Sequence, residues 1–309
     1  MNKKIIGMLH LLPLPGSPNY FGNFNEVIDR AKQDLENLLE GGINTVNIEN
    51  YGDVPFSNKP AKPITVSAFT KIVSHLESEF DFDFGVQVMR NDAISGLSIA
   101  EITGASFIRV NVLTGAVVAE EGIIEGDARS LMDLKKQLNS KVQVFADVLV
   151  KHAVPLGNQD LRLTAKATVE RNLADGIILT GDITGEEASV EDLKLLKQEL
   201  NKPILIGSGI NKDNVNVFLE HCDGVIVGTS LKKDNPKGLN YCWDKVMHPE
   251  FKEKTVYAES RLFTAPLGEV IRHNWFKDQS NIKREVLLRL HDEKRSRLSA
   301  MDGYTSRRC

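Results

Sequence analysis

The sequence predicts an α/β protein built as a closed (β/α)8 barrel. Eight short apolar runs rich in β-branched residues recur between residues 5 and 227, and amphipathic helical stretches separate them. The 309 residues suffice for one barrel of about 250 residues plus an extension. A doubly wound open sheet also alternates strands and helices, but it rarely needs eight similar units. We therefore prefer the barrel and keep the open sheet as the alternative.

The expected strands and helices can be placed along the chain by their apolar residues and by the glycines that end them. The first expected helix spans residues 24–42 and ends on Gly41-Gly42. Its apolar residues recur at helical spacing, which predicts one buried stripe. The expected strands are residues 5–11, 45–49, 84–89, 107–111, 142–147, 176–180, 203–206 and 224–227.

Polar side chains gather where the expected strands end. In a parallel barrel the carboxyl ends of all strands meet at one rim, where binding and catalytic residues lie. Any one of these residues alone is also typical of a helix cap or a solvated strand end. Eight strand ends converging on one rim favour a site. The candidates for substrate binding are Asn50, Gln87, Arg90, Asn91, Asp92, Arg109, Asn111, Thr180 and Asp182.

The candidate catalytic residues are Glu49, Asp147, His10, Lys151 and His152. Glu49 and Asp147 are expected across the mouth from one another, as an acid and a base on opposite sides of one substrate. Lys151 follows in a loop, so we expect it to stabilise an enolate or a phosphate rather than to form a Schiff base. His10 and His152 are candidates for proton transfer, and a hydrogen-bonded structural histidine is the alternative for each.

Two glycine turns end the last two expected strands. They contain Gly207, Ser208 and Gly209, and then Gly228, Thr229 and Ser230. In α/β barrels the loops after strands 7 and 8 commonly bind phosphate, because glycines let backbone N–H groups approach an anion. We expect these N–H groups at the starts of the following helices, where the helix dipole favours negative charge. The alternative is two tight turns that only close the fold.

A metal or nucleotide site has little support in the sequence. Glu49, Asp147, His10 and His152 offer ligand atoms, but no close-spaced pair such as H-x-H or H-E-x-x-H occurs. The P-loop pattern G-x-x-x-x-G-K-[S/T] is also absent. We therefore assign no metal and leave the cofactor unknown, with a divalent metal as an open alternative.

Composition excludes several classes of protein. The net charge of −4 and the pI near 6.0 argue against a nucleic-acid-binding surface on the whole molecule. No run approaches the ~20 apolar residues that a membrane span needs, and a strand-like run follows the first four residues. We expect a cytoplasmic protein without a cleaved signal. Three scattered cysteines, Cys222, Cys242 and Cys309, indicate neither a disulfide framework nor a metal site.

A change in charge marks an expected boundary at residue 250. Residues 250–309 contain 13 Lys or Arg against 9 Asp or Glu, so this part is net +4 while residues 1–249 are net −8. Residues 281–298 have apolar positions at roughly helical spacing among many charges. We predict a barrel domain over 1–249 and a basic extension over 250–309 that is helical or partly disordered, with binding to an acidic partner as the alternative.

Several segments carry longer motifs. They are G-M-L-H-L-L-P-L-P-G-S-P (7–18), N-I-E-N-Y-G-D-V-P-F (47–56), G-V-Q-V-M-R-N-D-A (85–93), F-I-R-V-N (107–111), A-D-V-L-V-K-H-A (146–153), G-S-G-I-N (207–211) and V-G-T-S-L-K (227–232). In this order the chain closely resembles the BtpA/SgcQ family from about residue 3 to about residue 235. The resemblance implies a barrel related to the ribulose-phosphate-binding group. It implies no single function, since one branch is tied to photosystem I accumulation and another lies among carbohydrate-use genes.

Two functions remain open at this level. The first is an enzyme acting on a small phosphorylated sugar or related metabolite, as an isomerase, epimerase or lyase, which the glycine turns and the rim residues favour. The second is a non-catalytic assembly or stability factor, which the photosystem branch suggests. We also expect a homo-oligomer, because residues 12–18 form a loop rich in apolar residues that would be better covered.

Overall fold

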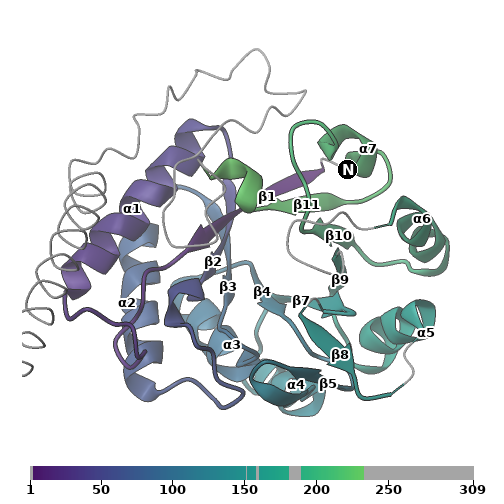
Figure 1. Cartoon of the computed structure of the whole chain (residues 1–309), viewed down its shortest axis with the longest axis horizontal. Coiled ribbons are helices and arrows are strands. Elements are labelled where there is room, and N and C mark those ends of the chain that lie inside the picture. Colours follow the sequence, from purple (N-terminus) through teal and green to yellow (C-terminus); the bar gives the residue numbers. More distant parts are fainter. Residues whose placement is uncertain (1–2, 151, 158–159, 181–188, 233–309) are drawn as a thin grey trace, which may run out of the picture. The chain divides into compact units, whose positions relative to one another are not determined.

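Eight parallel strands form a closed barrel in the computed structural model, which describes residues 3–150, 152–157, 160–180 and 189–232. Pairing of β11 with β1 closes the ring, with Val225 opposite Ile5 (Figure 1). The predicted barrel is confirmed, the open sheet is wrong, and the strand bounds lie within two residues of those expected. In ring order the strands are β1 (Lys4–His10), β2 (Thr45–Glu49), β3 (Asp83–Gln87), β4 (Phe107–Val110), β7 (Gln143–Val148), β9 (Gly176–Thr180), β10 (Ile204–Gly207) and β11 (Gly224–Val227).

Helices lie outside the ring of strands (Figure 1). The first begins where the Asn23 side chain accepts a hydrogen bond from the Glu26 N–H, and it buries the apolar stripe expected from the sequence. It ends at Glu40, and Gly42 turns the chain with a φ of 82°. The helices are α1 (Phe24–Glu40), α2 (Pro63–Glu79), α3 (Ala93–Thr103), α4 (Ala128–Gln137), α5 (Leu161–Lys166), α6 (Val190–Glu199) and α7 (Val215–Leu219), with short helical turns at Tyr51–Asp53, Ala167–Arg171 and Thr229–Leu231.

Strand side chains alternate between two apolar clusters. One alternate set packs with the helices in the large outer core, and the other fills the inside of the barrel. Inside, the Phe107 and Phe145 rings meet edge to face, with centroids 5.8 Å apart. A Cβ on Gly85 would lie 2.1 Å from the Phe107 ring, and one on Gly176 would lie 2.5 Å from the Phe145 ring. The two glycines therefore make room for the aromatic pair that plugs the barrel.

A small antiparallel sheet, which the sequence did not lead us to expect, lies beyond the barrel strands. It consists of β5 (Ala116–Ala119), β6 (Gly122–Glu125) and β8 (Ala153–Pro155), in the order β6-β5-β8. Its strands belong to the loops after β4 and β7, so they extend from the carboxyl end of the barrel.

The loop after β1 is packed into the protein. Leu14 is fully buried, and its N–H donates to the Asp53 carboxylate at 2.7 Å. The Pro15 carbonyl accepts a hydrogen bond from the Thr65 hydroxyl at 2.8 Å. The expectation that residues 12–18 expose an apolar surface is therefore wrong for most of the loop, because Asp53 and α2 hold it against the core. A homo-oligomer stays a prediction without this support.

The boundary at residue 250 and the basic extension lie outside the described residues. Among the helices that the structure does describe, none is both long and apolar enough to cross a membrane.

Candidate functional site at the carboxyl end of the barrel

The inward-facing positions of the strands bring several of the predicted site residues together. Residues two apart on a strand face the same side. His10 follows Met8 of the inner cluster in this way, and Arg109 follows Phe107. Asp147, Thr180 and Gly207 likewise follow Phe145, Ile178 and Leu205. The strand alternation therefore places these four side chains and Gly207 above the inner apolar cluster, at the carboxyl end of the barrel.

Arg109 and Asp147 form a buried ion pair with two parallel hydrogen bonds. Arg109 donates from Nε to Asp147 Oδ1 at 2.9 Å and from Nη2 to Oδ2 at 3.0 Å. Asn111 Nδ2 donates to the same Oδ2 at 2.7 Å. Burial alone would lower the pKa of Arg109, but the Asp147 charge and hydrogen bonds, with a smaller effect of Glu49, raise it. The guanidinium therefore stays charged.

This pairing changes the role that the structure favours for Asp147. The sequence suggested an acid or base opposite Glu49, yet both Asp147 oxygens accept hydrogen bonds from Arg109 and Asn111. Both oxygens of this carboxylate are therefore occupied by donors within the chain. Asp147 is better suited to hold the Arg109 guanidinium in place.

Amide side chains extend the same network across the barrel. Gln87 Nε2 donates to Asn111 Oδ1 at 3.0 Å, and Asn47 Nδ2 donates to Gln87 Oε1 at 3.2 Å. Among the described residues, Asn47 Oδ1 and Thr180 Oγ1 are buried atoms without a hydrogen-bond partner. The network therefore leaves at least two polar atoms that a ligand or water can satisfy. Asn47 was missed in the sequence, although it is polar and faces the same way as Glu49 on β2.

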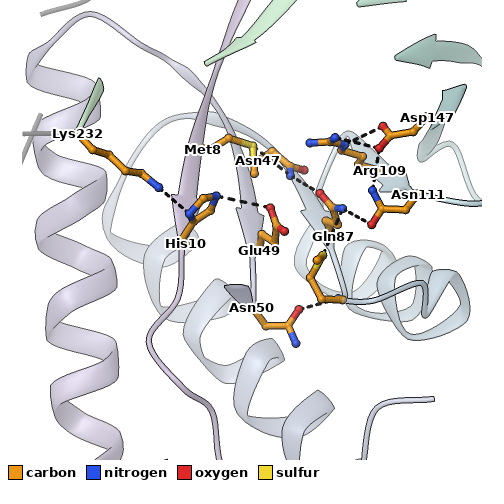
Figure 2. Close-up of polar contacts among 11 residues, drawn as sticks. Met8, His10, Asn47, Glu49, Asn50, Gln87, Arg109, Asn111, Asp147 and Lys232 are labelled. Atoms are coloured by element: carbon orange, nitrogen blue, oxygen red, sulfur yellow. Dashed lines mark hydrogen bonds and ion pairs between the residues drawn. The ribbon is translucent and has the colours of Figure 1, made fainter. Parts of the chain in front are cut away.

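Glu49, His10 and Lys232 form a second group beside the first (Figure 2). His10 lies between the other two, with Nε2 at 3.6 Å from Glu49 Oε2 and Nδ1 at 2.6 Å from Lys232 Nζ. The Tyr51 ring stacks on the imidazole with centroids 4.5 Å apart. Burial, and then the Glu49 charge, raises the pKa of the Tyr51 phenol, which keeps it protonated.

Lys232 is a second site residue, after Asn47, that was not predicted from the sequence. Its side chain is buried, and this burial lowers its pKa to about 7 against the opposing charges of Asp34 and Glu49. Lysines with such a lowered pKa occur at functional sites because both protonation states are then populated near neutrality. A signal was present in the sequence, since Lys232 lies two residues after the second glycine turn.

Three predicted substrate ligands instead tie loops together. Asn50 accepts a hydrogen bond from the Met89 N–H at 2.7 Å and donates to Asp53 at 2.7 Å. Asn91 exchanges two hydrogen bonds with the backbone of Val112, both at 2.8 Å. Asp92 accepts from the N–H groups of Ser95 and Ala61. These contacts favour a role in positioning the loops that surround the mouth.

Arg90 is also engaged within the chain. It is buried, and its Nε lies 3.6 Å from the Glu121 carboxylate, between β5 and β6. The contact links the loop after β3 to the small outer sheet. His152 is exposed, whereas Lys151 and Asp182 lie outside the described residues. The part of the chain that the structure describes contains no group of three His, Cys, Asp or Glu side chains that could hold a metal ion.

The two glycine loops lie side by side. Ser230 Oγ donates to the Ile210 carbonyl at 2.6 Å, and this hydrogen bond links the two loops. No backbone acceptor within the described ranges takes the N–H groups of Gly209, Ile210, Thr229 or Ser230. Ser208 and Gly209 have positive φ angles of 81° and 70°, as expected for a turn that presents consecutive N–H groups.

The expectation that both loops lead directly into helices is wrong. α7 begins only at Val215, and the turn at Thr229–Leu231 is a single 3-10 turn. Asn214 explains the first difference, because its side chain accepts the Asn211 N–H at 2.8 Å and donates to the Gly209 carbonyl at 2.9 Å. Any anion binding here would depend on loop N–H groups rather than on a helix dipole.

The first glycine loop also adjoins the buried ion pair. A Cβ on Gly207 would lie 2.9 Å from Ile178 Cγ2, 3.3 Å from Thr180 Cγ2 and 3.8 Å from Arg109 Nη2. The absence of a side chain at Gly207 thus lets the backbone of this loop approach the Arg109 guanidinium and the Thr180 side chain. This arrangement connects the glycine loops to the amide network.

Comparison with known proteins identifies relatives over most of the chain. The model of the family described as "BtpA family" matches residues 1–245. The photosystem I biogenesis protein BtpA of Synechocystis sp. is 42% identical over 271 residues, which cover 85% of this chain and 94% of that protein. An uncharacterized protein of Methanocaldococcus jannaschii is 45% identical over 232 residues, or 75% of this chain and 88% of that protein.

Solved structures are more distant. A structure of tryptophan synthase from Mycobacterium tuberculosis has a TM-score of 0.49 and 14% identity, covering 74% of this chain and 84% of that chain. A likeness at this level supports nothing about the reaction.

Proposed function

The chain belongs to the BtpA family, and from that premise we propose that its barrel is an enzyme acting on a small phosphorylated metabolite. The phosphate would bind at the two glycine loops, and Glu49 would exchange a proton with the substrate. The reaction class is isomerisation, epimerisation or carbon–carbon cleavage of a sugar phosphate or related compound, since each begins with such a proton transfer.

The observation that carries this proposal is the position of Gly207 beside Arg109. Phosphate binding needs several hydrogen-bond donors directed at one point, and a guanidinium nearby can add to them. The adjoining loops offer the N–H groups of Gly209, Ile210, Thr229 and Ser230, and a Cβ on Gly207 would be only 3.8 Å from Arg109 Nη2. Asp147 fixes the direction of the guanidinium but leaves the local charge balanced, so the loop N–H groups supply the main attraction.

Proton transfer is supported by the second group of residues. Glu49 is buried and faces the inside of the barrel, and His10 lies 3.6 Å from it. The Glu49 charge also raises the pKa of Arg109, so the two groups of residues are close enough to interact electrostatically. In this position Glu49 can serve as a base for a substrate whose phosphate is bound at the two glycine loops.

A specific observation favours a second candidate function. The Synechocystis relative, named for photosystem I biogenesis, is 42% identical over 85% of this chain. By analogy with the name of that relative, this barrel could act as a non-catalytic assembly or stability factor. Such a factor would not need Glu49, whereas the enzyme would.

Calorimetric titration tests phosphate binding. Inorganic phosphate and then ribose 5-phosphate are titrated into the wild type and into Gly228→Val. A Cβ on Gly228 would lie 3.3 Å from Met8 Cγ, so circular dichroism first checks that the Gly228→Val variant is folded. Loss of two charge-assisted hydrogen bonds, each worth about 1.5–3 kcal/mol, would weaken binding on the order of a hundredfold or more.

The matched control is Gly96→Ala on α3, where the new Cβ has no neighbour closer than 4.0 Å. Equal affinities in all three proteins would reject the phosphate site. If phosphate binds, incubation of sugar phosphates with the protein in D2O, read by NMR, separates enzyme from scaffold. Carbon-bound deuterium should appear with the wild type and not with Glu49→Gln.

A further inference from the structure

His10 has each ring nitrogen directed at a different titratable group. Nδ1 lies 2.6 Å from Lys232 Nζ, and Nε2 lies 3.6 Å from Glu49 Oε2 (Figure 2). Tyr51 stacks on the ring with an interplanar angle of 17°, which fixes its orientation. Lys232 and Glu49 are buried, so bulk water does not separate the three side chains.

The protonation state of Lys232 determines the tautomer of a neutral His10. An ammonium group can only donate, so Nδ1 must then accept, and the ring hydrogen lies on Nε2 facing Glu49. A neutral amine can accept, so Nδ1 can carry the hydrogen and the Nε2 lone pair then faces Glu49. Only this second tautomer lets His10 take a proton from Glu49.

We propose that Lys232 stores the proton that Glu49 removes from a substrate, with His10 as the bridge between them. The Glu49 O–H bond breaks as a bond forms at His10 Nε2. The His10 Nδ1–H bond breaks as a bond forms at the Lys232 Nζ lone pair, which gives an ammonium group and restores the Glu49 carboxylate. No electrons are transferred, and the reverse sequence returns the proton.

The surroundings of Lys232 allow both states near neutrality. Burial lowers its pKa to about 7, while Asp34 on α1 and Glu49 on β2 raise it and Arg30 on α1 lowers it further. His10 on β1 and the Tyr51 ring complete the groups that face this region. Lys232 does not contact the mouth directly in this scheme, so it is a positioning residue that acts through His10.

The relay deepens the proposed function, because it rests on Glu49 as the group that meets the substrate. The coupling between Lys232 and His10 stands without that assumption. It can therefore be measured in the protein alone, and its failure is distinguishable from a failure of phosphate to bind.

Histidine-selective ¹⁵N labelling of the full chain reads the tautomer directly. Long-range proton–nitrogen correlation spectra are recorded from about pH 6 to about pH 9. We expect the His10 ring hydrogen to move from Nε2 to Nδ1 with a midpoint near the titration of Lys232. The half-buried His75, whose Nε2 lies 3.2 Å from the Glu79 carboxylate, provides an internal reference.

Two variants complete the test. Lys232→Arg keeps a charged donor at every pH used and should hold His10 in the Nε2–H form. Lys232→Met removes the partner and should abolish the switch. An unchanged wild-type tautomer across this range would overturn the proposal, as would a switch that persists unchanged in Lys232→Arg. If the switch occurs but neither phosphate nor ribose 5-phosphate binds, the proposed function fails and the Lys232–His10 coupling stands.

Discussion

Arg109 and Asp147 meet in the barrel through two parallel hydrogen bonds, with both side chains buried. The geometry fixes the guanidinium plane, because two bonds to one carboxylate leave no freedom of rotation. Arg109 is therefore held beside Gly207 before any ligand arrives.

Breaking this pair should be costly. Asp147→Ala leaves the buried Arg109 charge without its partner, so we expect the free energy of unfolding to fall by about 3–5 kcal/mol in urea denaturation. The matched control is Asp133→Ala, which breaks an exposed Arg129–Asp133 pair of 2.6 Å and should cost less than about 1 kcal/mol. Similar losses in the two variants would contradict the importance of burial here.

The stability of the protein should rise with pH because of Lys232. Its pKa is about 7 in the folded chain against an ordinary value of 10.5. Below about pH 7 the lysine is charged in both the folded and the unfolded chain, and burying this charge destabilises the folded chain. Between these two pKa values the unfolded chain binds more protons, so stability increases by up to ~1.4 kcal/mol per pH unit.

Urea denaturation of Lys232→Met checks this sign. The variant lacks the titration, so the difference in stability between wild type and variant should shift by ~2–3 kcal/mol in favour of the wild type from about pH 7 to about pH 9. Lys212→Met removes an exposed lysine and should show no such shift. Parallel pH profiles for wild type and Lys232→Met would refute the expectation.

The aromatic plug should be sensitive to added volume. A methyl group at Gly85 would overlap the Phe107 ring, so Gly85→Ala is expected to destabilise by about 1–3 kcal/mol in thermal and urea unfolding. Phe107→Leu combined with Gly85→Ala should recover part of this loss. Independent, additive losses would show that the two positions do not share space. Gly96→Ala, with room around it, should be neutral or stabilise by up to about 1 kcal/mol.

Sedimentation tests the predicted oligomer. We expect the wild type to sediment as a dimer or larger species at high micromolar concentration, since barrels of this size often associate through outer helices. The buried position of Leu14 removes the loop after β1 as the expected contact. A single monomeric species at that concentration would reject the prediction.

Local pattern was enough to predict the barrel but not the pairing of its site residues. The eight runs and their polar ends could be read along the chain, because strand alternation and glycine turns are short-range signals. His10 and Lys232 are 222 residues apart and meet only because β11 pairs with β1. The pattern predicts that the ring closes, but no short-range signal shows which side chains meet between β1 and β11.

The role of Asp147 illustrates a second limit. Its place at a strand end was predicted, but the number of donors around it depends on where Arg109 and Asn111 point after packing. The sheet of β5, β6 and β8 was missed because its short strands lie in the loops after β4 and β7, outside the strand–helix alternation that marks the barrel strands.

Closure of the ring by β11 also has a consequence during synthesis. A ribosome makes β1 first, and the partner strand that covers its free edge emerges about 220 residues later. Until then, the nascent chain carries an unpaired strand edge of the kind that chaperones shield from other chains. Lys232 reaches His10 only after β11 has paired with β1, so a barrel without β11 would lack the proposed proton relay.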